Sequence, residues 1–166
     1  MQRYGEAVLP SFCDCVCSGT EPAAYRLLES MPTIDRDAAL RLTVHHGKET
    51  IVRALLENGA DVEAREKDGQ PVLIVAARKG YKGICRLLID GGANIEVRDS
   101  YAETALMLAA MHGSVEVVQL LLECNANVKA VNRWGLTAQA LAQRKKRYNI
   151  ADLLENYERR RGKQSI

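Results

Sequence analysis

The ten residues from Asp90 to Asp99 read DGGANIEVRD, and this stretch decides the fold because similar decapeptides occur three times in the chain. Thirty-three positions earlier, Glu57 to Glu66 read ENGADVEARE, and thirty-three positions later, Glu123 to Asn132 read ECNANVKAVN. Similarity at a fixed period of about 20 to 50 residues is typical of a solenoid built from stacked units. One helix pair cannot bury its apolar face alone, so the decapeptide is expected to join neighbouring units with one geometry.

Two helices are expected in each unit. Residues 71–80, PVLIVAARKG, predict a first helix that a proline opens and a glycine closes. A second helix over residues 84–90 follows, with apolar spacing that recurs in IVRALLENGA, ICRLLIDGGA and VVQLLLECNA, and Leu87 is expected to pack between neighbouring repeats. Gly92 is expected to end this helix, and Asn125, which tolerates the left-handed conformation, to end its equivalent. The remaining NIEVRDSYAE alternates apolar and polar residues and predicts a short hairpin finger.

The period and these motifs together resemble the ankyrin-repeat family. The segments NGADVEA, GGANIEV, AARKG and AAMHG are similar to the "GADVN" exit and "AAxxG" close of that family, and the match runs from about Gly19 to Tyr157. The resemblance implies an all-α ankyrin-repeat solenoid of stacked helix pairs, joined by β-hairpin-like fingers and closed by irregular capping repeats. It also implies a non-enzymatic protein–protein interaction module, such as an adaptor, inhibitor or targeting subunit.

The chain departs from the family pattern at the start of the first helices. In place of a complete TPLH it has PVLI at 71–74, TALM at 104–107 and TAQA at 137–140. Thr104 and Thr137 are still expected to cap their helices. The histidine with which the family ties neighbouring hairpins is missing, so a looser stack is expected. The segment QRKKRYN lacks the closing glycine, which indicates a last repeat that caps the array.

The period predicts the domain organisation. The expected units are an irregular N-terminal capping unit at 1–33, ankyrin repeats at 34–66, 67–99 and 100–132, a C-terminal capping repeat at 133–157, and a basic tail at 158–166.

Composition and charge favour a soluble folded protein, with 47% hydrophobic and 27% charged residues. Residues 1–128 carry 13 Lys and Arg against 18 Asp and Glu, whereas residues 129–166 carry 10 against 3. No apolar run approaches the roughly 20 residues that would span a bilayer. The five cysteines are an odd number without an export signal, so reduced thiols and a cytoplasmic or nuclear location are expected.

Metal binding and catalysis are not favoured by the sequence. Cys13, Cys15 and Cys17 form the best metal candidate, with His45 and His46 as conceivable partners. On a helix Cys13 and Cys17 face one another while Cys15 points away, and this spacing does not suit tetrahedral zinc, so thiols that pack a cap are the preferred interpretation. The chain has no Walker-type phosphate loop, serine elbow or His-rich metal pattern. No catalytic residue, metal ligand or cofactor is therefore predicted.

The candidate partner-binding residues lie at the finger tips and on the first helices. Aligned by the period, the tips carry Lys67 and Asp68, then Ser100 and Tyr101, then Arg133 and Trp134. The resemblance implies that partners bind a concave face of tips and first helices, whose variable positions are His45 and His46, Arg78 and Lys79, Met111 and His112, and Arg144 and Lys145. Such a basic face is expected to favour an acidic segment with an apolar anchor.

Alternatives remain for the aromatic tips and the basic end. Trp134 either clasps a partner's apolar side chain together with Tyr101, or folds back to cover the terminal repeat. Self-association through the tips is a further alternative. The basic runs RKKR at 144–147 and ERRRGK at 158–163 suit nucleic acid, an anionic membrane or an import receptor, but a solvated helix explains the first run. The second run lacks interleaved aromatics, so base stacking is not favoured.

Overall fold

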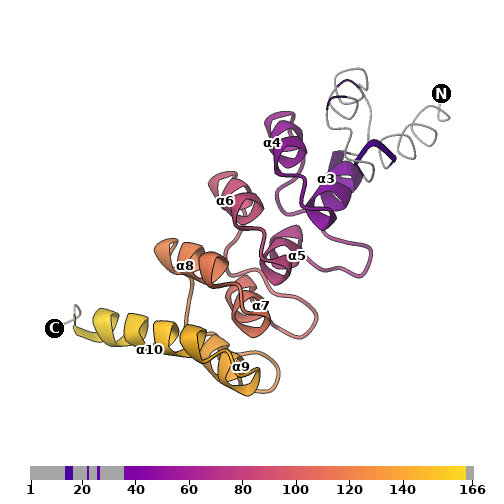
Figure 1. Cartoon of the computed structure of the whole chain (residues 1–166). Coiled ribbons are helices and arrows are strands. Elements are labelled where there is room, and N and C mark those ends of the chain that lie inside the picture. Colours follow the sequence, from indigo (N-terminus) through magenta and orange to yellow (C-terminus); the bar gives the residue numbers. More distant parts are fainter. Residues whose placement is uncertain (1–13, 17–21, 23–25, 27–35, 164–166) are drawn as a thin grey trace.

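The computed structural model describes residues 14–16, 22, 26 and 36–163, and in this part of the chain it is a stack of helix pairs. Figure 1 shows two rows of helices, with α3, α5, α7 and α9 in one row and α4, α6, α8 and α10 in the other. The predicted all-α solenoid is therefore confirmed. The elements are α3 (Arg36–His45), α4 (Glu49–Glu57), α5 (Val72–Lys79), α6 (Lys82–Asp90), α7 (Ala105–His112), α8 (Val115–Glu123), α9 (Ala138–Arg144) and α10 (Tyr148–Lys163).

The core runs continuously through the stack because every helix packs against the equivalent helix of the next unit. In the first row α3 packs on α5, α5 on α7 and α7 on α9, and in the second row α4, α6, α8 and α10 follow one another in the same way. A first helix in the middle of the stack is covered on three sides, so residues 72–77 of α5 and 105–110 of α7 are all buried. The alanine pairs Ala76/Ala77 and Ala109/Ala110 are fully buried and let the helices approach closely.

Left-handed residues close the first helices at the predicted interval. Gly47, Gly80 and Gly113 have φ angles of 71°, 79° and 91°. The last unit has no glycine here, and Lys146, thirty-three residues after Gly113, takes the same conformation with a φ of 59°. The second helices end in a similar way, since Asn125 has a φ of 61°. The repeat geometry therefore holds a lysine in a conformation that disfavours side chains with a Cβ.

Two local predictions have clear outcomes. Thr104 and Thr137 cap α7 and α9 as expected, because their hydroxyl oxygens accept hydrogen bonds from the amides of Met107 and Ala140 at 3.4 and 3.3 Å. The prediction that Leu87 packs between repeats is confirmed only in part, because Leu87 packs against the core but is only half-buried.

The fully buried leucine of α6 is Leu88, whereas Leu87 is only half-buried at the edge of the core. Helix α6 contains more large aliphatic residues than it has positions that face the core. The direction of α6, which tertiary packing fixes, selects among them.

Each finger is a tight reverse turn between two short antiparallel segments. Isolated antiparallel bridges pair Arg65 with Pro71 and Arg98 with Thr104, and the predicted β-hairpin-like fingers are thus confirmed. The turns close through hydrogen bonds from the amides of Gly69, Ala102 and Gly135 to the carbonyls three residues earlier, and these three donors have φ angles of 82°, 58° and 71°.

Carboxylates tie neighbouring fingers where the family's histidine is missing. The Glu63 side chain accepts a hydrogen bond from the amide of Asn94, and Glu96 accepts one from the amide of Asn127 at 2.7 Å. Glu63 and Glu96 are one period apart, and the third position of the series is Lys129. The expectation of a looser stack overlooked this ladder. The series changes to lysine in the last repeat, where α10 follows in place of another finger.

The C-terminal end of the stack is the 16-residue helix α10, which continues to Lys163. The basic residues at 158–163 belong to this helix. Most of the expected N-terminal capping unit at 1–33 lies outside the described residues, as do Cys13 and Cys17. The unit boundaries stay predictions. Among the described helices, none combines the length and the apolar character that a membrane span requires.

Candidate functional site

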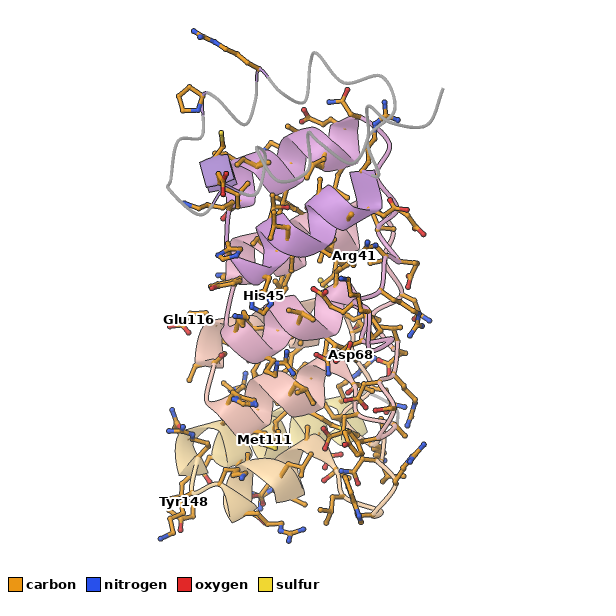
Figure 2. All side chains as sticks on the ribbon, turned by 90° about the vertical axis from the view of Figure 1, so that its right-hand side faces the viewer. Arg41, His45, Asp68, Met111, Glu116 and Tyr148 are labelled. Carbon is orange, nitrogen blue, oxygen red and sulfur yellow. The ribbon has the colours of Figure 1, made fainter. Side chains whose placement is uncertain are left out.

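The first-helix face, formed by the outward side chains of α3, α5, α7 and α9 together with the fingers, carries the residues predicted to bind a partner. Figure 2 looks onto this face and labels Arg41, His45, Asp68 and Met111 along it. The predicted tip residues are all exposed, namely Lys67, Asp68, Ser100, Tyr101, Arg133 and Trp134. On the helices, Arg78 and Met111 are half-buried, whereas Lys79, His112, Arg144 and Lys145 are exposed.

A pocket of about 650 Å³ lies on the first-helix face between α3, α5 and the first described finger. The structure brings the predicted residues His45, Lys67, Asp68 and Arg78 together around it. His46 lies outside this lining, and its ring stands edge-on to that of His45 with the ring centroids 5.6 Å apart. Sequence reasoning missed the remaining lining residues, which are Ala38, Arg41, Leu42, Glu66, Gln70 and Val75.

The Glu66 carboxylate gives this pocket an unused acceptor. Its Oε1 atom is buried and, among the described residues, is the one such side-chain atom without a hydrogen-bond partner. The period-mates Asp99 and Asn132 instead accept hydrogen bonds within their own fingers, from the amides of Tyr101 and Trp134.

The two aromatic tips form one exposed pair. The rings of Tyr101 and Trp134 stack with their centroids 5.7 Å apart and their planes at 21°. The Arg133 amide donates a hydrogen bond to the Tyr101 carbonyl at 3.1 Å, which joins the two fingers beneath the rings. Tyr101 remains 51% and Trp134 62% exposed, and Val131 beside them is exposed as well.

This stacking corrects the expected clasp. The rings contact one another, so no partner side chain fits between them, and a partner would cover their outer faces instead. The alternative in which Trp134 folds back over the terminal repeat also differs from the observed position, since the ring rests on the neighbouring finger and most of its surface is open.

A basic region lies at the opposite edge of the first-helix face, where the first helices end. His112 ends α7, and the partial burial of its ring lowers its pKa. The neighbouring charges of Arg78, Lys145 and Arg147 lower the pKa further. Arg147 was not among the predicted face residues, because the period places it after the turn and not on the helix. The repeated basic residues at the ends of the first helices were the signal for this region.

The described cysteines do not suggest chemistry. Cys85 is fully buried on α6, as predicted, and burial raises the pKa of its thiol to about 12. Cys15 and Cys124 are half-buried. Within the described ranges no group of three or more His, Cys, Asp or Glu side chains is arranged to hold a metal ion. The proposed facing pair Cys13 and Cys17 lies outside those ranges.

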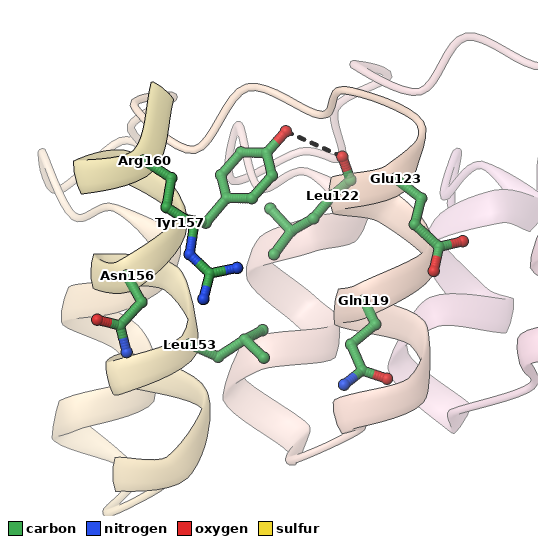
Figure 3. A pocket seen from close by; sticks show the side chains of 7 residues that line it. All are labelled: Gln119, Leu122, Glu123, Leu153, Asn156, Tyr157 and Arg160. Carbon is green, nitrogen blue, oxygen red and sulfur yellow. Dashed lines mark hydrogen bonds between the residues drawn. The ribbon is translucent and has the colours of Figure 1, made fainter. Parts of the chain in front are cut away.

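A second hollow, of about 550 Å³, lies on the other side of the stack between α8 and α10. Figure 3 shows Tyr157 of α10 reaching across it, where its hydroxyl donates a hydrogen bond to the Leu122 carbonyl at 3.0 Å. Leu153 and Leu122 supply the apolar wall, and this contact anchors the last helix to the stack. The lining residues are Gln119, Leu122, Glu123, Leu153, Asn156, Tyr157 and Arg160.

Comparison with known proteins agrees with the repeat geometry. A family model described as ankyrin repeats (3 copies) matches residues 12–99 and 92–161. No curated protein matches the chain. Proteins built from such repeats generally mediate protein–protein interaction and are typically non-enzymatic.

Proposed function

Because the chain belongs to the ankyrin-repeat family, we propose that it is an adaptor, inhibitor or targeting subunit that binds another protein on its first-helix face. The observation that carries this proposal is the exposed, stacked pair of Tyr101 and Trp134 on adjacent fingers. Tryptophan and tyrosine are enriched among the residues that dominate binding energy at protein interfaces.

The two rings are preorganised before a partner binds. Stacking restricts both rings, and the hydrogen bond from the Arg133 amide to the Tyr101 carbonyl fixes the spacing of their fingers. A side chain that is already ordered loses less conformational entropy on association. The outer faces of the rings therefore offer an apolar surface at a low ordering cost.

The remainder of the first-helix face would supply orientation. The pocket beside α3 and α5 is lined by Arg41, Lys67 and Arg78 and also by Glu66 and Asp68. An acidic partner segment suits the three cations. An apolar anchor on the aromatic pair would complete the contact.

The alternative of nucleic-acid or anionic-membrane binding through the C-terminal helix is less favoured. Arg159 pairs with Glu155 one turn earlier, and the Arg161 guanidinium lies 5.7 Å from the centre of the Tyr157 ring. These contacts within α10 occupy two of its three consecutive arginines. They suit a solvated helix end better than a surface prepared for phosphates.

Site-specific photo-crosslinking tests the proposed face. A photoreactive amino acid would replace Ser100 at a finger tip in one variant and Gln119 on the outer side of α8 in the other, since both side chains are exposed. In cell extract the Ser100 variant is expected to give discrete protein adducts that are weak or missing for the Gln119 variant. Equal adducts at both positions, or adducts at Gln119 alone, would contradict binding on the first-helix face.

A further inference from the structure

Three cationic side chains and one histidine, from three consecutive units, gather where the first helices end. Arg78 belongs to the last turn of α5, His112 to the end of α7, and Lys145 and Arg147 to the turn after α9. Helices α5, α7 and α9 pack side by side, which brings these residues together although 69 positions separate the first from the last. We call these four residues the cation cluster.

Arg147 reaches the cluster because the neighbouring unit leaves room for it. A Cβ atom placed on Gly113 would lie only 2.9 Å from the Arg147 Nε atom. The glycine that closes α7 therefore also allows the guanidinium to lie against the backbone next to His112. The position of Arg147 is thus set by packing between repeats.

The cluster carries no acidic partner within the described residues. The ion pairs in this part of the chain lie elsewhere, between Arg53 and Glu49, Arg86 and Glu123, and Arg159 and Glu155. The charged groups that act on His112 are Arg78 from α5 and Lys145 and Arg147 from the turn after α9. Helix α8, which also packs against α7, has Glu116 in its first turn, but this exposed carboxylate is not among the groups that act on His112.

Simple complementarity to helix dipoles does not account for the arrangement. A cation at the C-terminal end of a helix is stabilised by the free carbonyl groups, and this effect alone would raise the pKa of His112. Its pKa is instead lowered, by partial burial and by the three neighbouring cations. Among the described residues no carboxylate forms an ion pair with these side chains, so the protein itself leaves the positive charge of the cluster uncompensated.

We propose that the cation cluster binds an aspartate or glutamate carboxylate of the protein partner, and that His112 takes up a proton when this carboxylate arrives. The inference rests on the proposed function, because the cluster and the Tyr101–Trp134 pair lie at opposite ends of α7 on one face. It goes further by assigning a chemical group to a defined place. A protein segment is favoured over a membrane or nucleic acid because one segment satisfies both the aromatic pair and the cations.

Helix α7 also sets a lower limit on the spacing that the partner must present. It has 8 residues from Ala105 to His112, and at 1.5 Å per residue it separates its two ends by roughly 10 Å. The aromatic pair lies on the fingers before the first helices, so at about 3.3 Å per residue the apolar anchor and the acidic residue of an extended segment would lie at least about three residues apart. A partner with the two groups adjacent would engage only one end.

The pH dependence has a defined sign. In the free protein the pKa of His112 is lowered, and a carboxylate placed beside it raises that pKa, so the complex binds more protons than the separate molecules. Affinity therefore increases as the pH falls through the interval between the two pKa values. Uptake of one proton limits the change to at most about tenfold per pH unit.

The test uses a fluorescein-labelled hexaglutamate peptide as the probe, with hexaglutamine as its neutral counterpart. Anisotropy titrations of the full chain are expected to show hexaglutamate binding that tightens by about two- to tenfold from pH 8 to pH 6, and no hexaglutamine binding. Lys145→Gln and Arg147→Gln should each weaken hexaglutamate binding by about two- to fivefold, which is the usual contribution of an exposed charge contact. His112→Gln should remove the pH dependence of hexaglutamate binding.

A matched charge change elsewhere separates the cluster from overall net charge. Lys129→Gln removes one exposed cation at the foot of the last finger and should leave hexaglutamate binding unchanged. The imidazole resonance of His112, followed by NMR, should titrate at a higher pH when the probe is present. An unmoved His112 titration, or equal losses from Lys129→Gln and Arg147→Gln, would overturn the inference.

Further outcomes keep the inference distinct from the proposed function. If crosslinking at Ser100 captures a partner but hexaglutamate binding does not depend on His112 and Arg147, the carboxylate site is wrong and the proposed function stands. If the cluster binds hexaglutamate but partners crosslink only at Gln119, the proposed function is wrong, and with it the assignment of the carboxylate to a partner on this face. Vesicles with anionic lipid that bind through the same residues more tightly than hexaglutamate would also overturn the inference.

Discussion

The position of α6 in the stack makes a sharp prediction about two adjacent leucines. Leu88 is fully buried, on a helix that packs between α4 and α8, whereas its neighbour Leu87 is half-buried at the rim of the core. Truncating a fully buried leucine removes its transfer free energy and leaves a cavity, so Leu88→Ala should lower the free energy of unfolding by about 3 to 5 kcal/mol. Leu87→Ala leaves space that solvent fills, and should cost only about 1 to 2 kcal/mol.

Thermal and urea unfolding, followed by far-ultraviolet circular dichroism, measure both variants under one condition. For a chain of this size about 1 kcal/mol shifts the thermal midpoint by roughly 2 to 4 °C, so Leu88→Ala should melt about 6 to 20 °C below the parent. Leu87→Ala should melt about 2 to 8 °C below it. Equal costs for the two leucines, or a larger cost for Leu87→Ala, would refute the packing direction assigned to α6.

Three further predictions concern the turns, a buried acid and the finger ladder. Lys146→Gly should raise the thermal midpoint, because glycine removes a left-handed strain of about 1 kcal/mol or more at a φ of 59°. Burial raises the pKa of Glu103, so the contribution of this carboxyl group to stability falls as the pH rises through that pKa. Glu103→Gln keeps the hydrogen-bond acceptor for Asn132 and should stabilise the protein against urea at pH 8 but not at pH 4. Glu96→Ala should speed hydrogen exchange at the Asn127 amide, while the equivalent amide of the preceding finger keeps its protection.

Much of the fold could be predicted from the sequence because a repeat imposes its own geometry. A residue needed at one joint is needed at every joint, so glycines at 47, 80 and 113 identify the helix ends without knowledge of distant contacts. Thr104 and Thr137 likewise identify helix starts, since their caps depend only on residues three positions away. Local chemistry at a fixed period therefore predicted the elements and their order.

Features that depend on contacts between units were harder to predict. The last repeat lacks the closing glycine, yet Lys146 takes the left-handed conformation at the same position of the repeat. The aromatic tips were expected to stand apart, whereas their rings meet because the fingers are tied beneath them. The unused Glu66 oxygen depends on one extra methylene relative to Asp99. Side-chain reach across a joint decides each case, and the period alone does not give it.

The sequence also contains a signal for the carboxylates that connect neighbouring fingers. The carboxylates Glu63 and Glu96 recur one period apart and give way to Lys129, as expected for side chains that bind the next finger. Such a series indicates where the run of fingers stops. It would have predicted the ladder that replaces the missing histidine.

The most direct test of the central claim measures Trp134→Ala for partner affinity and for stability on the same preparation. The partner would be the protein crosslinked at Ser100, and Gln119→Ala on the outer side of α8 would be the control. If the Tyr101–Trp134 pair is the anchor, Trp134→Ala should weaken binding by about 2 to 4 kcal/mol, or roughly 30- to 700-fold, while its thermal midpoint stays within about 3 °C of the parent. Unchanged affinity of the folded variant, with or without a lower midpoint, would contradict partner binding through the aromatic pair.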